Sequence, residues 1–406
     1  MNIFFKGYCR IYQKSLKIAS RFIPFPEPKL IEGSNSLNKV PSILKDHKKV
    51  HPLIVSGKTV SRLGLFNPLL DSLEAAGIKF AIFDETIPNP TFEVVEKAYL
   101  KYKENNCDSI IAFGGGSTID AAKAIGVKAV YPNRDLSSFK KILSVHHKTP
   151  FLIAIPTTAG TGSEATVAAV LIDSKTKDKF SINDPVLIPD VAILDDTLLS
   201  NLPSKTIAET GMDALTHALE AYIGRSPTIK TNEYALTALK LIQNYLYDFY
   251  SDPTNGIARA NMQKASYLAG VSFTKAYIGY VHALAHALGG YYNISHGLAN
   301  AILLPYVLEA YDKKAYKRLA EICDDLSLID PLSDKESKSK AVIAWIRELN
   351  EKMGIPSHFG NLIKNDDELE FLADHAYKEA NPLYPVPKEL GKEELKEILI
   401  KANQGN

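Results

Sequence analysis

Residues 109–127 read SIIAFGGGSTIDAAKAIGV, and they carry the strongest structural signal in the chain. Ser109–Phe113 predicts a buried strand, three glycines follow, and Thr118–Val127 has helical periodicity. A strand that turns through glycines into a helix is typical of nucleotide-binding α/β folds, where the helix amino terminus meets a phosphate. The turn is not GxGxxG, because Ile119 occupies the last position, and it is not a Walker loop. Taken alone, it is also compatible with an ordinary tight turn.

The same strand–helix alternation extends over residues 52–200. Apolar runs predict further strands at Pro52–Ser56, Phe80–Phe83 and Phe151–Ile155, and helices are predicted at Asn67–Ala76 and Phe92–Asn105. Continuously apolar strands separated by helices indicate a parallel sheet that is covered on both faces. We therefore expect a doubly wound α/β architecture with ligands beyond the carboxyl ends of the strands.

The pattern becomes helical after Leu202-Pro203-Ser204, where Ser204 is the expected N-cap. Apolar residues then recur at helical spacing over Thr206–Tyr222, Asn232–Tyr247 and Met262–Ser272. We expect two domains: an α/β dinucleotide-binding domain over 1–203 and an all-α metal-binding, catalytic domain over 204–406.

A second polar loop follows the strand at 151–155. Residues 156–164 read PTTAGTGSE and contain four hydroxyl groups and two glycines. Hydroxyl and amide donors at this density suit a bound phosphate, ribose or carboxamide, although a serine- and threonine-rich turn is the plain alternative. Two such loops after two strands of one sheet favour nucleotide binding.

Histidines and one acid form a candidate metal site in the helical half. Asp213 and His217 are four residues apart, as are His282 and His286, so each pair projects from one helix face. We expect Gly289-Gly290 to end that second helix and a turn to bring back His296. A carboxylate with three imidazoles suits Fe(II) or Zn(II). Each pair alone could also be a helix-capping or core histidine.

Charge and cysteine content exclude several classes of protein. The net charge is only +1, whereas nucleic-acid binders normally show a basic excess, so we expect no nucleic-acid partner. The three cysteines are scattered without a CxxC pair, which argues against disulfides and suits a reducing compartment. No apolar run approaches the ~20 residues that span a bilayer.

The first 28 residues form a distinct segment. Residues 1–23 interleave basic and apolar side chains, no acid precedes Glu27, and Pro24, Pro26 and Pro28 follow. A cationic amphipathic helix of this kind could lie on a membrane or act in targeting. The favoured interpretation is a helix that packs onto its own domain, without a membrane partner.

At this point the chain resembles the iron-containing (group III) alcohol dehydrogenases. The resemblance runs from about Ile31 and rests on GGGSTIDAAKA, PTTAGTGSE, MDALTHALEAY and HALAHALGG with SHGLANA, in this order. It implies a nucleotide-binding α/β domain followed by a helical metal domain, in a cytoplasmic homo-oligomer, a dimer or larger. It also implies the metal ligands Asp213, His217, His282 and His296. His286 occupies the position of a non-ligand histidine near the nicotinamide and is a candidate proton relay.

The resemblance further implies a set of cofactor-binding residues. Gly115, Gly116 and Ser117 would hold the pyrophosphate, and the residues that would line the rest of the cofactor are Thr157, Thr158, Thr161, Ser163, Asn89 and Lys179. One departure concerns the segment after the first strand, Val55-Ser56-Gly57-Lys58-Thr59, where members that use NAD usually carry an acid. Gly57 removes the repulsion of a 2′-phosphate, which Ser56 and Lys58 could bind. We therefore predict a preference for NADP(H) over NAD(H).

These observations predict an NAD(P)-linked alcohol dehydrogenase or aldehyde reductase that acts on a small alcohol or aldehyde. Fe(2+) is the expected metal, with Zn(2+) as the alternative. Three readings remain open on the same fold: a zinc glycerol dehydrogenase, a dehydroquinate-synthase-like lyase, and a non-catalytic nucleotide sensor. The complete ligand set argues against a metal-free branch such as the maleylacetate reductases.

Overall fold

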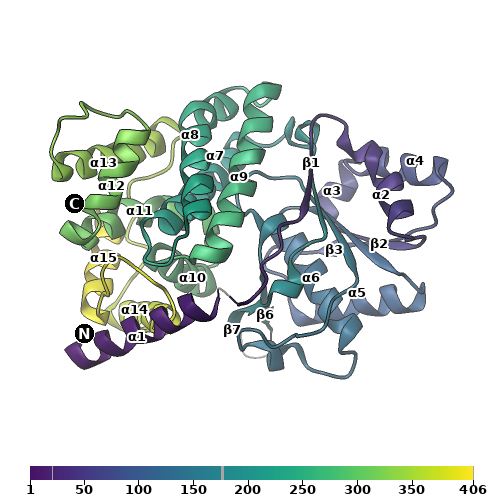
Figure 1. Ribbon diagram of the computed structural model, residues 1–406, viewed down its shortest axis with the longest axis horizontal. Helices are drawn as coiled ribbons and strands as arrows, with labels where there is room; N and C mark the ends of the chain where they lie inside the picture. Colours follow the sequence, from purple (N-terminus) through teal and green to yellow (C-terminus); the bar gives the residue numbers. More distant parts are fainter. Residues whose placement is uncertain (21, 175–177, 406) are drawn as a thin grey trace. The chain divides into compact units, whose positions relative to one another are not determined.

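The computed structural model describes residues 1–20, 22–174 and 178–405, and the chain divides into two compact units (Figure 1). The α/β unit contains residues 25–202 and 254–267, and the helical unit contains 1–24, 203–253 and 268–406. This division differs from a single boundary at 203/204. The amino-terminal segment groups with the helical unit, and the first part of helix α9 (Gly256–Ala276) groups with the α/β unit.

A parallel sheet forms the centre of the α/β unit, as the sequence predicts. Its strand order is β1-β8-β5-β4-β2-β3. The predicted strands are observed as β2 (Pro52–Gly57), β3 (Ala81–Thr86), β4 (Ser109–Gly114) and β5 (Phe151–Pro156). The structure also contains strands that the sequence pattern did not predict: the four-residue strands β1 (Lys29–Glu32) and β8 (Val191–Leu194), and the antiparallel pair β6 (Ala168–Asp173) and β7 (Asp178–Asn183). The four-residue runs of β1 and β8 are too short to establish a periodicity, a reason that does not apply to the six-residue strands β6 and β7.

Helices cover both faces of this sheet, and every residue of the central strands β4 and β5 is therefore buried. Helices α5 (Phe92–Glu104) and α6 (Gly116–Val130) pack over a core that includes Leu53, Ile110 and Leu152. On the opposite face the Phe66 ring, at the start of α4 (Asn67–Ala75), meets the edge of Phe113 at a centroid distance of 6.0 Å. This unit also contains α2 (Val40–Asp46) and α3 (Lys58–Arg62).

The register of the central strands brings the two polar loops together. β4 and β5 pair in parallel from Ser109 opposite Phe151 to Gly114 opposite Pro156. Both strands therefore end at the same level, and the glycine turn and the PTTAGTGSE loop leave the sheet side by side.

The helical unit contains the predicted helices, with two corrections at their ends. Its helices are α7 (Ser204–Ile223), α8 (Ile229–Ser251), α10 (Tyr280–Tyr292), α11 (His296–Tyr311), α12 (Tyr316–Asp325), α13 (Lys335–Lys352), α14 (Asp366–Ala380) and α15 (Lys392–Gln404). Ser204 is the first helical residue rather than the N-cap, which is Pro203. Gly289-Gly290 lies inside α10, which ends only at Asn293 in the left-handed conformation. Glycine costs a helix only about 1 kcal/mol, which tertiary packing outweighs.

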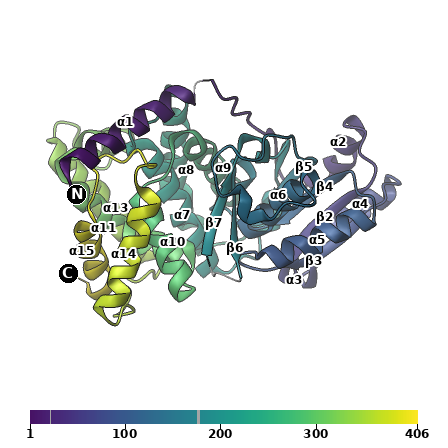
Figure 2. The ribbon, with the colours of Figure 1, turned by 90° about the horizontal axis from the view of Figure 1, so that it is seen from below.

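The amino-terminal helix α1 (Ile3–Ala19) lies along the outside of the helical unit (Figure 2). Its inner face buries Cys9 and Gln13, and Gln13 Nε2 donates to the Tyr384 carbonyl at 2.8 Å. Arg10 pairs with Glu389. The favoured expectation that this helix packs against the protein is met, but it packs on the helical unit rather than on the α/β region. Among the described residues, no helix is long and apolar enough to cross a membrane.

Candidate metal centre and cofactor loops

Three helices bring together the four residues that the resemblance assigns to a metal. α7 carries Asp213 and His217 one turn apart, α10 carries His282, and α11 begins at His296. One potential ligand atom from each lies within 4.8 Å of the others, and only His296 is not fully buried. Asp213 Oδ1 is 3.6 Å from His296 Nε2 and 3.9 Å from His282 Nε2. His286, the fifth polar residue of the predicted constellation, is not a member of this group.

These donors fit a divalent transition metal. Imidazole and carboxylate ligands bind zinc at about 2.0–2.2 Å, so two ligands on one ion lie up to about 4.4 Å apart. The separations from Asp213 Oδ1 fall in this range. The carboxylate of Asp213 is nearly fully buried and needs compensating charge, which a divalent cation would supply.

Close packing of α11 on α7 depends on a glycine. A Cβ atom on Gly297 would lie 2.2 Å from the carbonyl oxygen of Glu209. Only glycine therefore allows the first turn of α11 to approach α7 this closely, and this approach places His296 beside Asp213.

Glu220, which the sequence analysis did not single out, holds His282 in place. Its carboxylate accepts hydrogen bonds from His282 Nδ1 at 2.6 Å and from the backbone amides of Gly279 at 2.7 Å and Val281 at 2.9 Å. Burial works against a charged imidazole, but the Glu220 hydrogen bond and charge raise the pKa of His282 above its usual value. Because Nδ1 donates to Glu220, Nε2 points to the cluster, as in carboxylate–histidine–metal arrangements. The sequence spacing could have indicated this residue, since Glu220 lies three residues after His217 and so falls on the same side of α7.

Asn300 contacts the cluster from α11. Its side-chain Nδ2 donates to Asp213 Oδ1 at 2.7 Å and lies 3.2 Å from His296 Nε2. The amide therefore orients the acid of the cluster. A lone asparagine in an apolar helix gave no signal of this role in the sequence.

His286 lies beside the cluster and has its own partners. Its ring stacks on the His296 ring at a centroid distance of 5.1 Å and an interplanar angle of 16°. Its Nδ1 is 2.7 Å from Oε1 of Glu379 on α14. This arrangement separates His286 from the four candidate ligands, as the resemblance implies.

In the α/β unit, Gly116 allows the two polar loops to touch. A Cβ atom on Gly116 would lie 2.7 Å from Thr161 Oγ1, too close for an ordinary contact, whereas one on Gly115 would lie at a normal contact distance of 3.5 Å from Thr158 Oγ1. The Thr157 amide donates to the Gly114 carbonyl at 3.1 Å. The structure thus assembles these candidates at the carboxyl edge of the sheet, next to the amino terminus of α6.

Asn89, Ser117 and Lys179 also come together. The backbone N–H of Asn89 donates to Ser117 Oγ at 3.3 Å, and Lys179 Nζ donates to the side-chain Oδ1 of Asn89 at 3.0 Å. Three segments that are far apart in sequence therefore meet at the first turn of α6.

Two candidate hydroxyls are already engaged within the protein. Ser56 is fully buried and donates to the Phe113 carbonyl at 2.8 Å, so it does not offer its hydroxyl to a 2′-phosphate as expected. Ser163 donates to Asp120 Oδ1 at 2.6 Å. Small hydroxyls at the end of a buried strand satisfy neighbouring acceptors first, because a buried acceptor without a partner is costly. Of the Ser56–Lys58 segment, Lys58 has an exposed side chain.

Lys123 on α6 forms a polar clamp with the backbone of residues 163–168 that the sequence pattern did not predict. Lys123 is almost fully buried, and its Nζ donates to the carbonyls of Ser163, Thr166 and Ala168 at 2.7–2.9 Å. Burial lowers the pKa of Lys123 to about 8 and raises that of buried Glu164 to about 7. The clamp fixes the end of the PTTAGTGSE loop to the helix that follows the glycine turn. A lysine within the apolar run AAKAI was the available signal.

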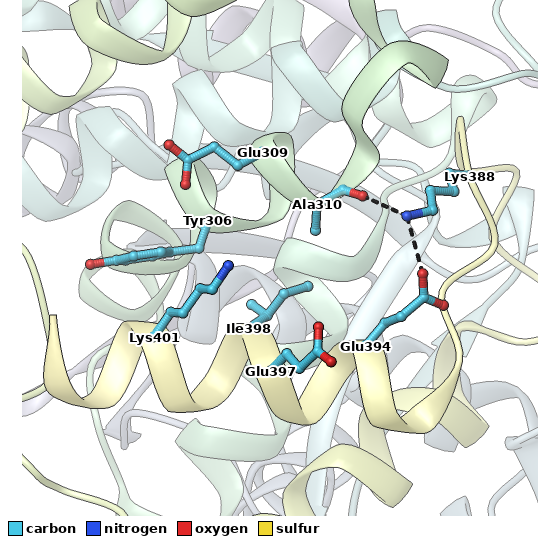
Figure 3. Close-up of a pocket in the computed structure, with 8 residues that line it drawn as sticks. All are labelled: Tyr306, Glu309, Ala310, Lys388, Glu394, Glu397, Ile398 and Lys401. Atoms are coloured by element: carbon cyan, nitrogen blue, oxygen red, sulfur yellow. Dashed lines mark hydrogen bonds and ion pairs between the residues drawn. The ribbon is translucent and has the colours of Figure 1, made fainter. Parts of the chain in front are cut away.

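A separate hollow lies between α11 and α15 (Figure 3). Lys388 Nζ reaches the Ala310 carbonyl at 2.9 Å and Glu394 at 3.1 Å, and Glu309 pairs with Arg347 at 2.6 Å. None of the predicted site residues lines this hollow, and we assign it no role in the chemistry.

Comparison with known proteins agrees with the geometry. The family described as iron-containing alcohol dehydrogenase matches residues 27–196, and the family described as Fe-containing alcohol dehydrogenase, C-terminal, matches residues 207–403. The NAD-dependent methanol dehydrogenase of Bacillus methanolicus is 34% identical over 88% of this chain and 93% of its own length. The NADPH-dependent butanol dehydrogenase of Clostridium saccharobutylicum is 35% identical over 90% of this chain and 94% of its own length.

A solved structure titled 1,3-propanediol oxidoreductase superposes with a TM-score of 0.90 at 34% identity, covering 94% of this chain and 99% of that one. Sequence families, relatives and fold agree over nearly the whole chain. This chain is an NAD(P)-dependent oxidoreductase that belongs to the iron-containing alcohol dehydrogenase family.

Proposed function

We propose that this protein is a metal-dependent alcohol dehydrogenase or aldehyde reductase that prefers NADP(H) and acts on a small alcohol or aldehyde. The observation that carries the proposal is the buried group formed by Asp213, His217, His282 and His296. The lyase and sensor alternatives share this two-unit architecture, so the preference for hydride transfer over them rests on the relatives, which are dehydrogenases by name.

When bound, the divalent ion would supply Lewis-acid polarisation of the substrate oxygen. His286 would carry the proton that the substrate oxygen loses on oxidation or gains on reduction, since an imidazole nitrogen can both accept and donate a proton. Asp213 and the three ligand histidines would hold the ion, and Glu220 and Asn300 would keep His282 and Asp213 in position. Fe(2+) is our first choice because of the family, and the donors would also accept Zn(2+).

The NADP(H) preference rests on the segment after β2. Gly57 offers no carboxylate to repel a 2′-phosphate, and the exposed Lys58 beside it offers a cation. With Ser56 engaged by the Phe113 carbonyl, Lys58 is the side chain that we assign to the phosphate. Relatives of similar identity use either cofactor by name, so this segment has to be tested directly.

The substrate class follows the relatives, whose names specify methanol, butanol and 1,3-propanediol. We also propose, from the family, a cytoplasmic homo-oligomer, a dimer or larger, without a nucleic-acid partner.

The test is loss of nicotinamide absorbance by anaerobically iron-reconstituted protein with butanal, with NADPH or NADH, and with a chelator-treated control. We expect rapid, chelator-sensitive oxidation of NADPH and slower oxidation of NADH. The His282→Ala variant serves as a matched control that should match the chelated enzyme. Absence of turnover with either cofactor across neutral, hydroxylated and acidic aldehydes would contradict the proposal.

A further inference from the structure

A second carboxylate lies next to the candidate proton carrier. Glu379, near the end of α14, places Oε1 2.7 Å from Nδ1 of His286 on α10, with about a fifth of each side chain exposed (21% and 23%). The same oxygen accepts a hydrogen bond from the buried Tyr384 hydroxyl at 2.8 Å. One carboxylate thus joins an imidazole from α10 and a phenol that follows α14.

This contact fixes the protonation pattern of the imidazole. A carboxylate oxygen can only accept, so Nδ1 of His286 must carry the hydrogen. In the neutral ring, Nε2 then has the lone pair. Burial alone would raise the pKa of Glu379, but His286, the Tyr384 hydroxyl and nearby His375 together lower it, so the carboxylate is ionised.

The ring is also fixed in orientation. Besides the Nδ1 hydrogen bond, the face of His286 stacks on His296, with an interplanar angle of 16°. A hydrogen bond at one ring atom and a stack on one face leave little freedom to flip the ring, and Nε2 has no hydrogen-bond partner among the described residues.

We propose that Glu379, held by Tyr384, is a positioning residue that fixes the Nδ1–H tautomer and the orientation of His286, so that Nε2 is the atom that exchanges the proton. The inference rests on the proposed function and extends it, since it names the atom that carries the proton and the residues that prepare it. In serine hydrolases an aspartate has the corresponding role for a histidine base.

The first test reads the tautomer without using activity. Zinc-reconstituted protein with ¹⁵N-labelled histidine gives ring nitrogen shifts, and His286→Asn identifies the signals of His286. We expect the wild type to show a protonated Nδ1 and an unprotonated Nε2. Glu379→Leu should abolish this pattern, and Glu379→Asp should largely restore it. An unchanged His286 pattern in Glu379→Leu would overturn the proposal.

The second test is a double-mutant cycle on turnover. Glu379→Leu should lower kcat about tenfold in the wild-type background and less than twofold in His286→Ala, because it acts through that residue. Glu370→Gln is the matched control, since Glu370 is on the same helix and pairs with Lys392 and Lys396 instead. Metal content, measured in parallel, should remain at the wild-type level in every variant.

Equal losses in the two backgrounds would show that Glu379 acts on stability or on substrate, and would overturn the proposal. Glu379→Gln, which keeps an acceptor oxygen, covers the case in which the leucine variant fails to fold; it should fall between wild type and leucine. If the wild type turns over no aldehyde, the proposed function fails, and the nitrogen shifts still decide whether Glu379 sets the tautomer.

Discussion

His282 and His286 lie one turn apart on α10, and their different roles follow from what each Nδ1 contacts. Glu220 accepts from His282 inside the helical unit, whereas Glu379 accepts from His286 at its partly exposed edge. Sequence spacing alone cannot separate these two residues, since both repeat at helical spacing in VHALAHALGG. The acids that distinguish them lie more than 60 positions away on other helices.

For single residues, we predict that two similar substitutions both lower activity but differ in their effect on metal content. His282→Ala should lose the metal and, with it, activity. His286→Ala should keep stoichiometric metal and lose turnover by about 10²-fold, the lower end of general acid–base contributions. Metal analysis of both purified variants, together with kcat, checks this prediction. Equal metal loss in both would place His286 among the ligands.

A single residue should also set cofactor choice. Gly57 has an extended backbone that any residue can adopt, and an added Cβ would lie 3.3 Å from the Thr86 carbonyl, which is tight but tolerable. Gly57→Asp places a carboxylate where the 2′-phosphate is expected and should raise the KM for NADPH about tenfold or more, while NADH binding is kept or improved. Gly57→Ala is the control for added bulk. An unchanged NADPH-to-NADH ratio in the aspartate variant would remove Gly57 from cofactor choice.

At the level of secondary-structure elements, the clamp formed by Lys123 on α6 holds a loop whose Glu164 has a raised pKa. Lys123 Nζ connects α6 to the backbone of residues 163–168 through hydrogen bonds. Glu164 belongs to this segment, and its side chain is buried. The pKa of Glu164, about 7, is above the usual value for glutamate because burial disfavours the carboxylate. The folded state therefore holds this proton more tightly than the unfolded state does.

The sign of the pH effect follows from this difference. Between the unfolded pKa, about 4.3, and the folded pKa, about 7, stability decreases as pH rises, because only the folded state keeps the proton. Glu164→Gln removes the ionisation. It should differ little from wild type at pH 5 and should be more stable at pH 8 by on the order of 2 kcal/mol.

Melting temperatures at pH 5 and pH 8 provide the measurement. The exposed Glu74→Gln on α4 serves as the control for loss of a carboxylate at the surface. A gap between Glu164→Gln and wild type that is the same at both pH values would contradict a raised pKa at this position.

At the scale of the whole molecule, the sequence predicted the parallel sheet and the helical second half, and the family resemblance named the same four residues that the structure brings together as a possible metal site. Continuously apolar runs such as 109–113 and i, i+4 pairs such as Asp213 and His217 are visible in the local sequence, so they can be recognised without knowing any distant contact. Residues whose role depends on a distant partner could not be found in this way. Glu379 reaches His286 only because α14 packs beside α10. The Ser56 hydroxyl, which we expected to bind a 2′-phosphate, instead donates to the Phe113 carbonyl on the neighbouring strand.

The division into units also depends on long-range contacts that a local sequence pattern does not show. A boundary at 203/204 follows from the change of periodicity, but periodicity does not show that residues 1–24 pack with the second unit. The contacts responsible are long-range, such as Gln13 with the Pro382 and Tyr384 carbonyls.

We propose that the cluster of Asp213, His217, His282 and His296 holds one catalytic divalent ion per chain. Its most direct test is an anaerobic titration of metal-free protein with Fe(2+), in which bound iron and the rate of NADPH oxidation with butanal are measured on the same samples. We predict that the rate rises in proportion to bound iron and levels off at one ion per chain, and that Asp213→Ala shows neither binding nor rate. Full turnover by the metal-free protein, or tight iron binding by Asp213→Ala, would contradict this account.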